Sequence, residues 1–194
     1  MLNELDLLDW KKLVAPYARA ELWRSLWQIA NTLAPFFALW GAMLWSLNIS
    51  YWLTLALAFP AALFLVRAFI IFHDCCHRSF FKSQAANEWL GRVLGVLTFT
   101  PFTHWGHHHA IHHATAGNLD KRGVGDVKTM TLAEYLSSPW WKRLGYRIMR
   151  NPVFLFTIGA SFVFLVSHRF WTPNSSRRDR LSVLTTNLAL LGTL

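Results

Sequence analysis

Charged residues are scarce in this sequence, and cysteines are scarcer still. Only 15% of the 194 residues are charged, whereas about 25% is usual for soluble domains, so the composition disfavours a soluble globular fold. The two cysteines, Cys75 and Cys76, are adjacent, so they cannot easily bridge to each other, and no disulfide framework exists. We expect them to be small apolar fillers in a reducing compartment.

Charge is entirely absent from one long stretch, Ser25 to Val66. A membrane-spanning helix needs about 20 apolar residues, so this stretch has room for two. The polar residues 48–50 between them favour a reversal of the chain. The sequence therefore predicts a transmembrane hairpin with helices over 26–47 and 51–72. A cleaved secretory signal is disfavoured, because residues 2–10 are acidic and amphipathic.

Four further segments are predicted after the hairpin. Residues 83–97 and 140–150 have helical periodicity but are too short to span a bilayer, so we expect them to lie along its surface. Asn87 falls on the polar side of the first of these helices. Residues 153–167 are apolar but short, which predicts a re-entrant or interfacial segment. Residues 181–194 read as the start of a further membrane helix that is cut.

The segment between these helices has its own signals. Residues 115–129 are polar and contain three glycines, which predicts a loop. Thr131 and Glu134 have the spacing of a capping box for a short helix. The helix over 140–150 combines tryptophans with basic residues, the pattern of an interfacial element over anionic lipid.

The net charge of +9 is concentrated in two blocks. One block precedes the hairpin, from Lys11 to Arg24, and the other extends from Arg78 to Arg150. The positive-inside rule puts the first block on the cytoplasmic side, and a two-helix hairpin returns the chain to that side. We therefore expect an integral membrane protein with its amino terminus and histidines cytoplasmic. In so apolar a chain, nucleic-acid binding is disfavoured.

Histidine is the residue that the sequence holds in excess. His73 and His77 are spaced i and i+4, and His109, His112 and His113 are spaced i, i+3 and i+4, so each set shares one helix face. Neutral imidazole is the commonest nitrogen ligand for iron, zinc and copper. These five candidate ligands are too many for one four-coordinate zinc.

Two segments resemble the histidine boxes of membrane fatty acid desaturases. His73 to Phe81 is similar to the first box of that family, and His109 to His113 is similar to the second. The order of the boxes, the hairpin before them and residues 114–120 after them strengthen the likeness. It covers essentially the whole chain and is greatest to the bacterial acyl-lipid, omega-6 type.

The resemblance implies an all-α membrane fold that carries a di-iron centre and uses O2 to place a double bond in an acyl chain. It further implies membrane acyl lipids as substrate and an electron donor such as ferredoxin or cytochrome b5. No catalytic residue is assigned beyond the metal site. The implied iron ligands are His73, His77, His109, His112 and His113.

The sequence departs from the family pattern in three ways. Cys76 stands where glycine is usual, and three further histidines, His104, His107 and His108, are additional; we expect these three to form a polar surface. The family also has a third histidine box, to which nothing here corresponds, because His168 stands alone. With five of about eight expected imidazoles, we expect this chain alone to be a fragment that is inactive.

Other interpretations stay open. His73-Asp74-x-x-His77 matches a zinc hydrolase pattern with aspartate in place of glutamate, but Asp74 better fits an acceptor that orients a ligating imidazole. A related di-iron hydroxylase or ketolase would share both boxes. A non-enzymatic membrane metal-binding protein is a further alternative, although a metal carrier needs more polar residues within the bilayer than the hairpin offers.

Overall fold

The described part of the chain is all-helical. The structure, a computed structural model, describes residues 12–17 and 19–193, and within these ranges it contains helices, turns and loops but no strand. The predicted all-α membrane fold is therefore confirmed. The amphipathic pattern predicted for residues 2–10 lies outside the described ranges. The chain forms two compact units, one ending at Leu94 and the other beginning at Gly95.

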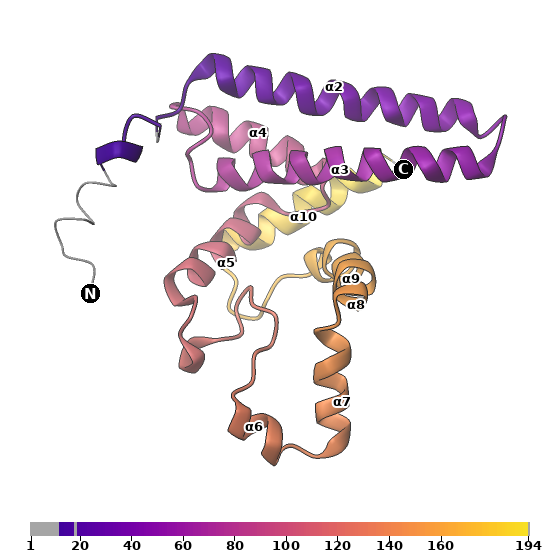
Figure 1. The fold of residues 1–194 in the computed structure, drawn as a ribbon. Helices are drawn as coiled ribbons and strands as arrows, with labels where there is room; N and C mark the ends of the chain where they lie inside the picture. The colour runs from indigo at the N-terminus through magenta and orange to yellow at the C-terminus, as the bar shows by residue number, and fades with distance from the viewer. Residues whose placement is uncertain (1–11, 18, 194) are drawn as a thin grey trace. The chain divides into compact units, whose positions relative to one another are not determined.

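The first unit contains the predicted hairpin. Helix α2 (Leu22–Ser46) and helix α3 (Tyr51–Cys76) lie side by side (Figure 1), and both are long and apolar enough to cross a membrane. The turn between them closes with a hydrogen bond from the Ser50 amide to the Ser46 carbonyl, 2.9 Å long. Helix α3 continues past residue 72, so that His73 lies in its last turn and His77 forms its C-cap.

Buried small residues recur at seven-residue intervals along both helices of the hairpin. The series is unbroken in α3, whereas in α2 the larger Leu39, which is half-buried, takes one position. At one end of the series, the hydroxyls of Ser46 and Thr54 are hydrogen-bonded at 2.7 Å. Small side chains at this interval let membrane helices approach closely with a coiled-coil-like crossing. We call these small residues the small-residue seam: Ser25, Thr32 and Ser46 in α2, and Thr54, Ala61, Ala68 and Cys75 in α3.

Arg67, the one charged residue between Ser25 and Phe72, is paired within the hairpin. Arg67 of α3 donates from Nη2 to Oδ1 of Asn31 in α2, at 2.7 Å, and its Nη1 lies 3.4 Å from the Asn31 carbonyl oxygen. An ionised side chain in a membrane is costly unless polar groups satisfy it. Arg67 and Asn31 therefore add a polar link between α2 and α3.

Helix α3 ends in a Schellman motif immediately after its histidines. The Arg78 amide donates to the Cys75 carbonyl and the Ser79 amide to the Asp74 carbonyl, at 3.0 and 3.1 Å. This motif requires a left-handed residue, usually glycine, but here Arg78 adopts it with φ of 57°. The backbone therefore turns sharply one residue after His77.

The segment that follows this turn is held by two buried polar side chains. Ser25 of α2 donates its hydroxyl to the Phe80 carbonyl at 2.6 Å. Asn87 of α4 (Gln84–Leu97) accepts from the Phe81 amide and donates to the carbonyls of Phe81 and Ser83. Helix α4 matches the predicted helix, but the placement of Asn87 on its polar side was wrong, because this amide is buried and binds the loop.

The second unit is built around two neighbouring helices, α5 (Phe102–Thr115) and α10 (Arg177–Leu191). A capping box of Ser176 and Asp179 begins α10, whose last residues overlap the predicted start of a membrane helix. Between α5 and α10 the chain forms a short turn, η1 (Leu119–Lys121), within the predicted loop.

Two helices that follow this loop agree with the sequence. Helix α6 (Leu132–Ser137) begins at the predicted capping box of Thr131 and Glu134, in which both reciprocal hydrogen bonds are present. Helix α7 (Trp140–Met149) occupies the predicted basic segment.

The apolar segment after α7 is longer than the sequence predicts. It consists of α8 (Pro152–Phe154), a π-helical turn η2 (Leu155–Gly159), α9 (Ala160–Leu165) and a final turn η3 (Ser167–Arg169). Asn151 caps its start by accepting from two backbone amides, and η3 adds a turn at its end. The resulting 18 residues are long and apolar enough to cross a membrane.

Candidate metal centre

The histidines of the first box form a close pair on α3. The Nε2 atoms of His73 and His77 are 3.3 Å apart, and their ring centroids are 4.5 Å apart. His73 is half-buried and His77 is exposed. The i, i+4 spacing thus brings two imidazole nitrogens to the separation that two ligands of one metal ion require: with metal–nitrogen bonds of about 2.1 Å, adjacent ligands lie about 3 Å apart.

Asp74 orients the first ring of this pair. Its Oδ1 lies 3.1 Å from Nδ1 of His73. A carboxylate there accepts the Nδ1 proton, which leaves the lone pair on Nε2, the atom that faces His77. An acid in the last turn of a helix opposes the helix dipole, so Asp74 does not stabilise α3 through its charge. The contact instead fixes the orientation and tautomer of His73.

The histidines of the second box form an equivalent pair on α5. The Nε2 atoms of His109 and His113 are 3.0 Å apart, and their ring centroids are 4.5 Å apart. The ring of Trp105, one turn earlier, stacks on His109 with centroids 4.3 Å apart and limits its rotation. Each unit of the chain therefore holds one histidine pair with the spacing of a chelate.

His112, the remaining histidine of the second box, faces a loop carboxylate. Its Nδ1 is 2.9 Å from Oδ1 of Asp126, although the two atoms are not aligned for a hydrogen bond. The loop passes closely over this ring: a Cβ on Gly125 would lie 3.1 Å from the His112 Cβ, and Gly125 has φ of 74°. Only glycine fits this position comfortably.

Sequence reasoning missed Asp126 altogether. The available signal was an aspartate directly after two glycines, Gly123 and Gly125, in the loop that follows the second box. Both glycines adopt positive φ, which bends the loop back toward α5. An acidic residue that follows two closely spaced glycines, in the loop after a histidine box, is therefore the pattern that could have marked Asp126 as a candidate.

The three additional histidines occupy another part of α5. The expectation of a polar surface was wrong for His104, which is only 7% exposed and whose Nε2 has no hydrogen-bond partner among the described residues. Burial, and next the neighbouring His108, lower the pKa of His104; burial and His107 lower the pKa of His108. Both rings are therefore neutral at neutral pH.

His107 links α5 to the start of α10. Its Nδ1 is 3.1 Å from Oδ2 of Asp179, and the same oxygen accepts from the amide and the hydroxyl of Ser176. Burial alone raises the pKa of Asp179, but the hydrogen bonds from Ser176 and His107 outweigh it and leave the pKa below its usual value. His107 thus has a structural partner, with no sign of a ligand role.

The other side chains that drew attention in the sequence are also placed. Nδ1 of His168 is 3.4 Å from the Thr100 hydroxyl, so this histidine is bonded to a neighbouring loop. Cys75 is fully buried in the small-residue seam and Cys76 is half-buried; neither forms a disulfide. These observations agree with a packing role for the cysteines.

These features define a class: all-helical membrane proteins whose histidine pairs are arranged for metal ligation. Residues 50–194 match the fatty acid desaturase family, which includes both histidine boxes. The chain belongs to this family and is an integral membrane protein.

Individual relatives agree with this assignment. The chain is 49% identical to a fatty acid desaturase of Bacillus subtilis, over 93% of this chain and 51% of the relative. It is 33% identical to the sn-1 oleoyl-lipid 12-desaturase of Synechocystis, over 61% of this chain and 32% of the relative. It is 31% identical to the sn-1 acyl-lipid omega-3 desaturase (ferredoxin) of the same organism, over 45% of this chain and 25% of the relative.

The chain spans about half the length of the first of these relatives and less of the others. No solved structure matches it significantly.

Proposed function

We propose that this chain acts in fatty acid desaturation, the O2-dependent introduction of a double bond into an acyl chain of a membrane lipid. The observation that carries the proposal is the pair of Nε2 atoms presented by each histidine box, 3.3 Å apart in one and 3.0 Å apart in the other. Family membership supplies the chemical context for these pairs.

The proposed ligands of two iron ions are His73, His77, His109, His112 and His113. The donor set fits iron, because neutral imidazoles suit this metal and leave it cationic and oxidising. When bound, the iron pair would supply the O2 activation needed to remove two hydrogens from an unactivated methylene. The protein's own contribution is positional: Asp74 orients His73, Trp105 restricts His109, and Asp126 places a negative charge beside His112.

The same proposal covers orientation, substrate and electron supply. We expect the histidines and the amino terminus on the cytoplasmic side of a bacterial inner membrane, because basic residues flank the hairpin on that side. The acyl-lipid and ferredoxin names of the Synechocystis relatives support a lipid substrate and a ferredoxin-type donor. The exposed basic residues of the second unit suit an acidic donor.

The zinc hydrolase interpretation has less support. In that mechanism the acid between the two histidines activates water. Here the Asp74 carboxylate is in contact with His73. The zinc hydrolase interpretation also gives the second histidine box no role. A di-iron hydroxylase or ketolase would use the same histidine pairs, and no observation favours it over desaturation.

Metal binding by the purified chain tests the proposal. Iron and zinc bound to the detergent-solubilised protein are measured by mass spectrometry after anaerobic loading with equal amounts of each ion. We expect iron binding that falls at least tenfold in His73→Ala and in His109→Ala, while the control His168→Ala retains it. Preference for zinc with peptidase activity, or iron binding unchanged in both variants, would contradict the proposal.

A further inference from the structure

A basic pocket lies between α6 and α7, away from the histidines. Its wall contains two cations, Arg147 and Arg150, and two tyrosines, Tyr135 and Tyr146, and no acidic side chain. Leu132, 74% exposed, also lines it. The pocket therefore combines two positive charges with an apolar edge, and its chemistry favours an anion attached to an apolar group.

Aromatic rings hold both arginines in place. The Arg147 guanidinium lies over the Tyr135 ring at 5.8 Å and donates from Nε to the Tyr135 hydroxyl at 2.6 Å. The Arg150 guanidinium lies over Tyr146 at 5.7 Å and donates from Nη1 to the Lys128 carbonyl. Among the described residues, the terminal amino groups of Arg147 and the Nη2 group of Arg150 have no hydrogen-bond partner. Prepositioned guanidinium groups of this kind bind phosphate with paired hydrogen bonds.

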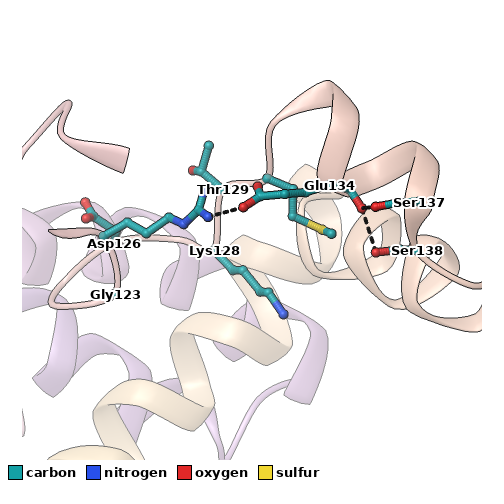
Figure 2. A pocket seen from close by; sticks show the side chains of 9 residues that line it. Gly123, Asp126, Lys128, Thr129, Glu134, Ser137 and Ser138 are labelled. Carbon is teal, nitrogen blue, oxygen red and sulfur yellow. Dashed lines mark hydrogen bonds and ion pairs between the residues drawn. The ribbon is translucent and has the colours of Figure 1, made fainter. Parts of the chain in front are cut away.

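A neighbouring pocket also contains basic side chains, but carboxylates in its wall balance their charge. There the Arg122 guanidinium is ion-paired with Glu134, and Asp126 adds a second carboxylate to the wall (Figure 2). Hydroxyls of Ser137 and Ser138 donate to the Glu134 backbone carbonyl. No carboxylate of this kind balances Arg147 and Arg150 in the pocket between α6 and α7.

The residues of α7 have the pattern of a helix that lies at a membrane surface. Trp140, Trp141, Leu144 and Ile148 are exposed along one side of α7, and the basic residues lie on the other. Exposed tryptophans beside arginines are typical of helices at the headgroup level. Arg150 stands two residues before Pro152, where the apolar segment able to cross a membrane begins.

We propose that this pocket binds the phosphate of an anionic phospholipid, with Arg147 and Arg150 as the contacting groups. The exposed apolar side of α7 would lie in the surrounding acyl chains, and Leu132 would contact the lipid glycerol region. An acidic protein partner fits less well, because it would leave this apolar side without a cover. The inference depends on the membrane location of the chain, and is independent of the proposed iron chemistry.

Native mass spectrometry of the whole chain in detergent micelles tests the assignment. The protein is titrated with dioleoyl phosphatidylglycerol and, separately, with dioleoyl phosphatidylcholine. The double variant Arg147→Gln/Arg150→Gln is compared with Lys142→Gln/Arg143→Gln, which removes the same charge from the same helix outside the pocket. Circular dichroism verifies that both variants retain their helical content.

We expect the chain to bind phosphatidylglycerol in preference to phosphatidylcholine. The pocket variant should lose about tenfold or more in affinity for the anionic lipid, and the matched variant should lose less than about threefold. Equal losses in both variants would show general charge attraction and overturn the assignment, as would equal binding of the two lipids.

Two further measurements separate the lipid from other anions. Millimolar inorganic phosphate should leave phosphatidylglycerol bound; displacement would assign the pocket to free phosphate. An acidic ferredoxin-type protein should bind wild type and pocket variant alike. If it bound only the wild type, while lipid binding was the same in both, the pocket would belong to a protein partner.

Discussion

Three of the nine histidines each contact one carboxylate. Asp74 contacts His73, Asp126 contacts His112 and Asp179 contacts His107. The first two of these histidines belong to the boxes, whereas the third links two helices. Carboxylates in contact with ligating imidazoles raise ligand basicity and fix ring orientation. Two of these acids therefore lie beside proposed iron ligands, whereas the third links α5 to α10.

Removal of the first two acids should weaken metal binding. We expect Asp74→Ala and Asp126→Ala each to lower iron affinity about 10-fold to 100-fold, because His73 loses the carboxylate that orients it and His112 loses a negative charge beside it. The control is Asp120→Ala, which removes a loop acid that contacts neither box. Anaerobic iron titration of the three variants measures the effect. Affinity unchanged in both test variants would show that these acids have no role at the metal.

Asp179 should make the link between α5 and α10 sensitive to acid. Its pKa is lower in the folded chain than in the unfolded one, because its hydrogen bonds outweigh the effect of burial. The carboxylate therefore stabilises the fold above its ordinary pKa of about 4, and this stabilisation is lost as pH falls through the lowered value.

Thermal unfolding in detergent at different pH values tests this. At pH 7, Asp179→Asn should destabilise the protein by about 1–3 kcal/mol through its weakened hydrogen bonds. The difference from wild type should shrink toward pH 3. A difference that stayed constant between pH 7 and pH 3 would contradict the assignment of the effect to the ionised carboxylate.

For single residues, the sequence predicts pairings within one helix well, but it predicts polar contacts between distant segments poorly. The i, i+4 spacing of His73 and His77 predicts their pairing, because a single helix determines it. The burial of His104 and Asn87 depends on chain segments that pack against them, and no local pattern reports these. The contact of Asp126 with His112 requires a loop to fold back, so the glycines before Asp126 could mark it as a candidate but could not give its partner.

At the scale of helices, the C-terminal ends of α3 and α4 contain the unusual backbone conformations. Helices α3 and α4 both end in Schellman motifs, in which Arg78 and Phe99 adopt φ of 57° and 56°. A left-handed conformation costs a residue with a Cβ roughly 1–2 kcal/mol relative to its ordinary conformations. Arg78 directly follows His77 in the first histidine box, and Phe99 precedes the helix of the second box. The chain thus accepts local strain where it turns beside each box.

Replacement of Arg78 by glycine should relieve this cost. We expect Arg78→Gly to stabilise the protein by up to about 1 kcal/mol, because glycine adopts the left-handed conformation readily. The matched control Arg78→Ala keeps a Cβ and removes the same charge, so it should give no gain. Thermal unfolding of the three proteins in the same detergent measures the difference. Equal melting temperatures for the glycine and alanine variants would show that the backbone at this position is unstrained.

Local sequence patterns predict most helices here: an uncharged apolar stretch for the hairpin, helical periodicity for α4 and α7, and a capping box for α6. The hairpin, α4, α6 and α7 all appear where the sequence predicts them. The apolar segment from Pro152 is the exception: it is longer than its apolar run because Asn151 and the turn at Ser167–Arg169 extend the helical backbone with polar residues. The length of an apolar run therefore underestimates the length of a helix that polar caps and final turns extend.

At the scale of the whole molecule, the number of imidazoles limits what the chain can do. The boxes supply five candidate ligands, and the alignments with the chain cover 51% and 32% of two of its relatives. The family pattern of about eight imidazoles would need three more. We therefore propose that the number of ligands, rather than the fold, limits the activity of these 194 residues when they are tested alone.

We expect the 194-residue chain alone to bind less than two equivalents of iron and to form no detectable double bonds. The measurements are iron content after anaerobic loading and oleoyl-to-linoleoyl conversion in membranes supplied with reduced ferredoxin and O2. A sample inactivated by His73→Ala serves as the background. Two tightly bound irons with turnover above this background would show that five imidazoles suffice.

The small-residue seam also sets the direction in which the first histidine box faces. Cys75 is the last member of the seam in α3 and lies between His73 and His77, so the rotation of α3 about its own axis is coupled to its packing against α2. One residue added to α3 between Ala68 and His73 would turn both imidazoles by about 100° relative to the seam. The number of residues in this part of α3 therefore determines the direction of the histidines as well as their distance along the helix. A substitution is tolerated there more readily than an insertion.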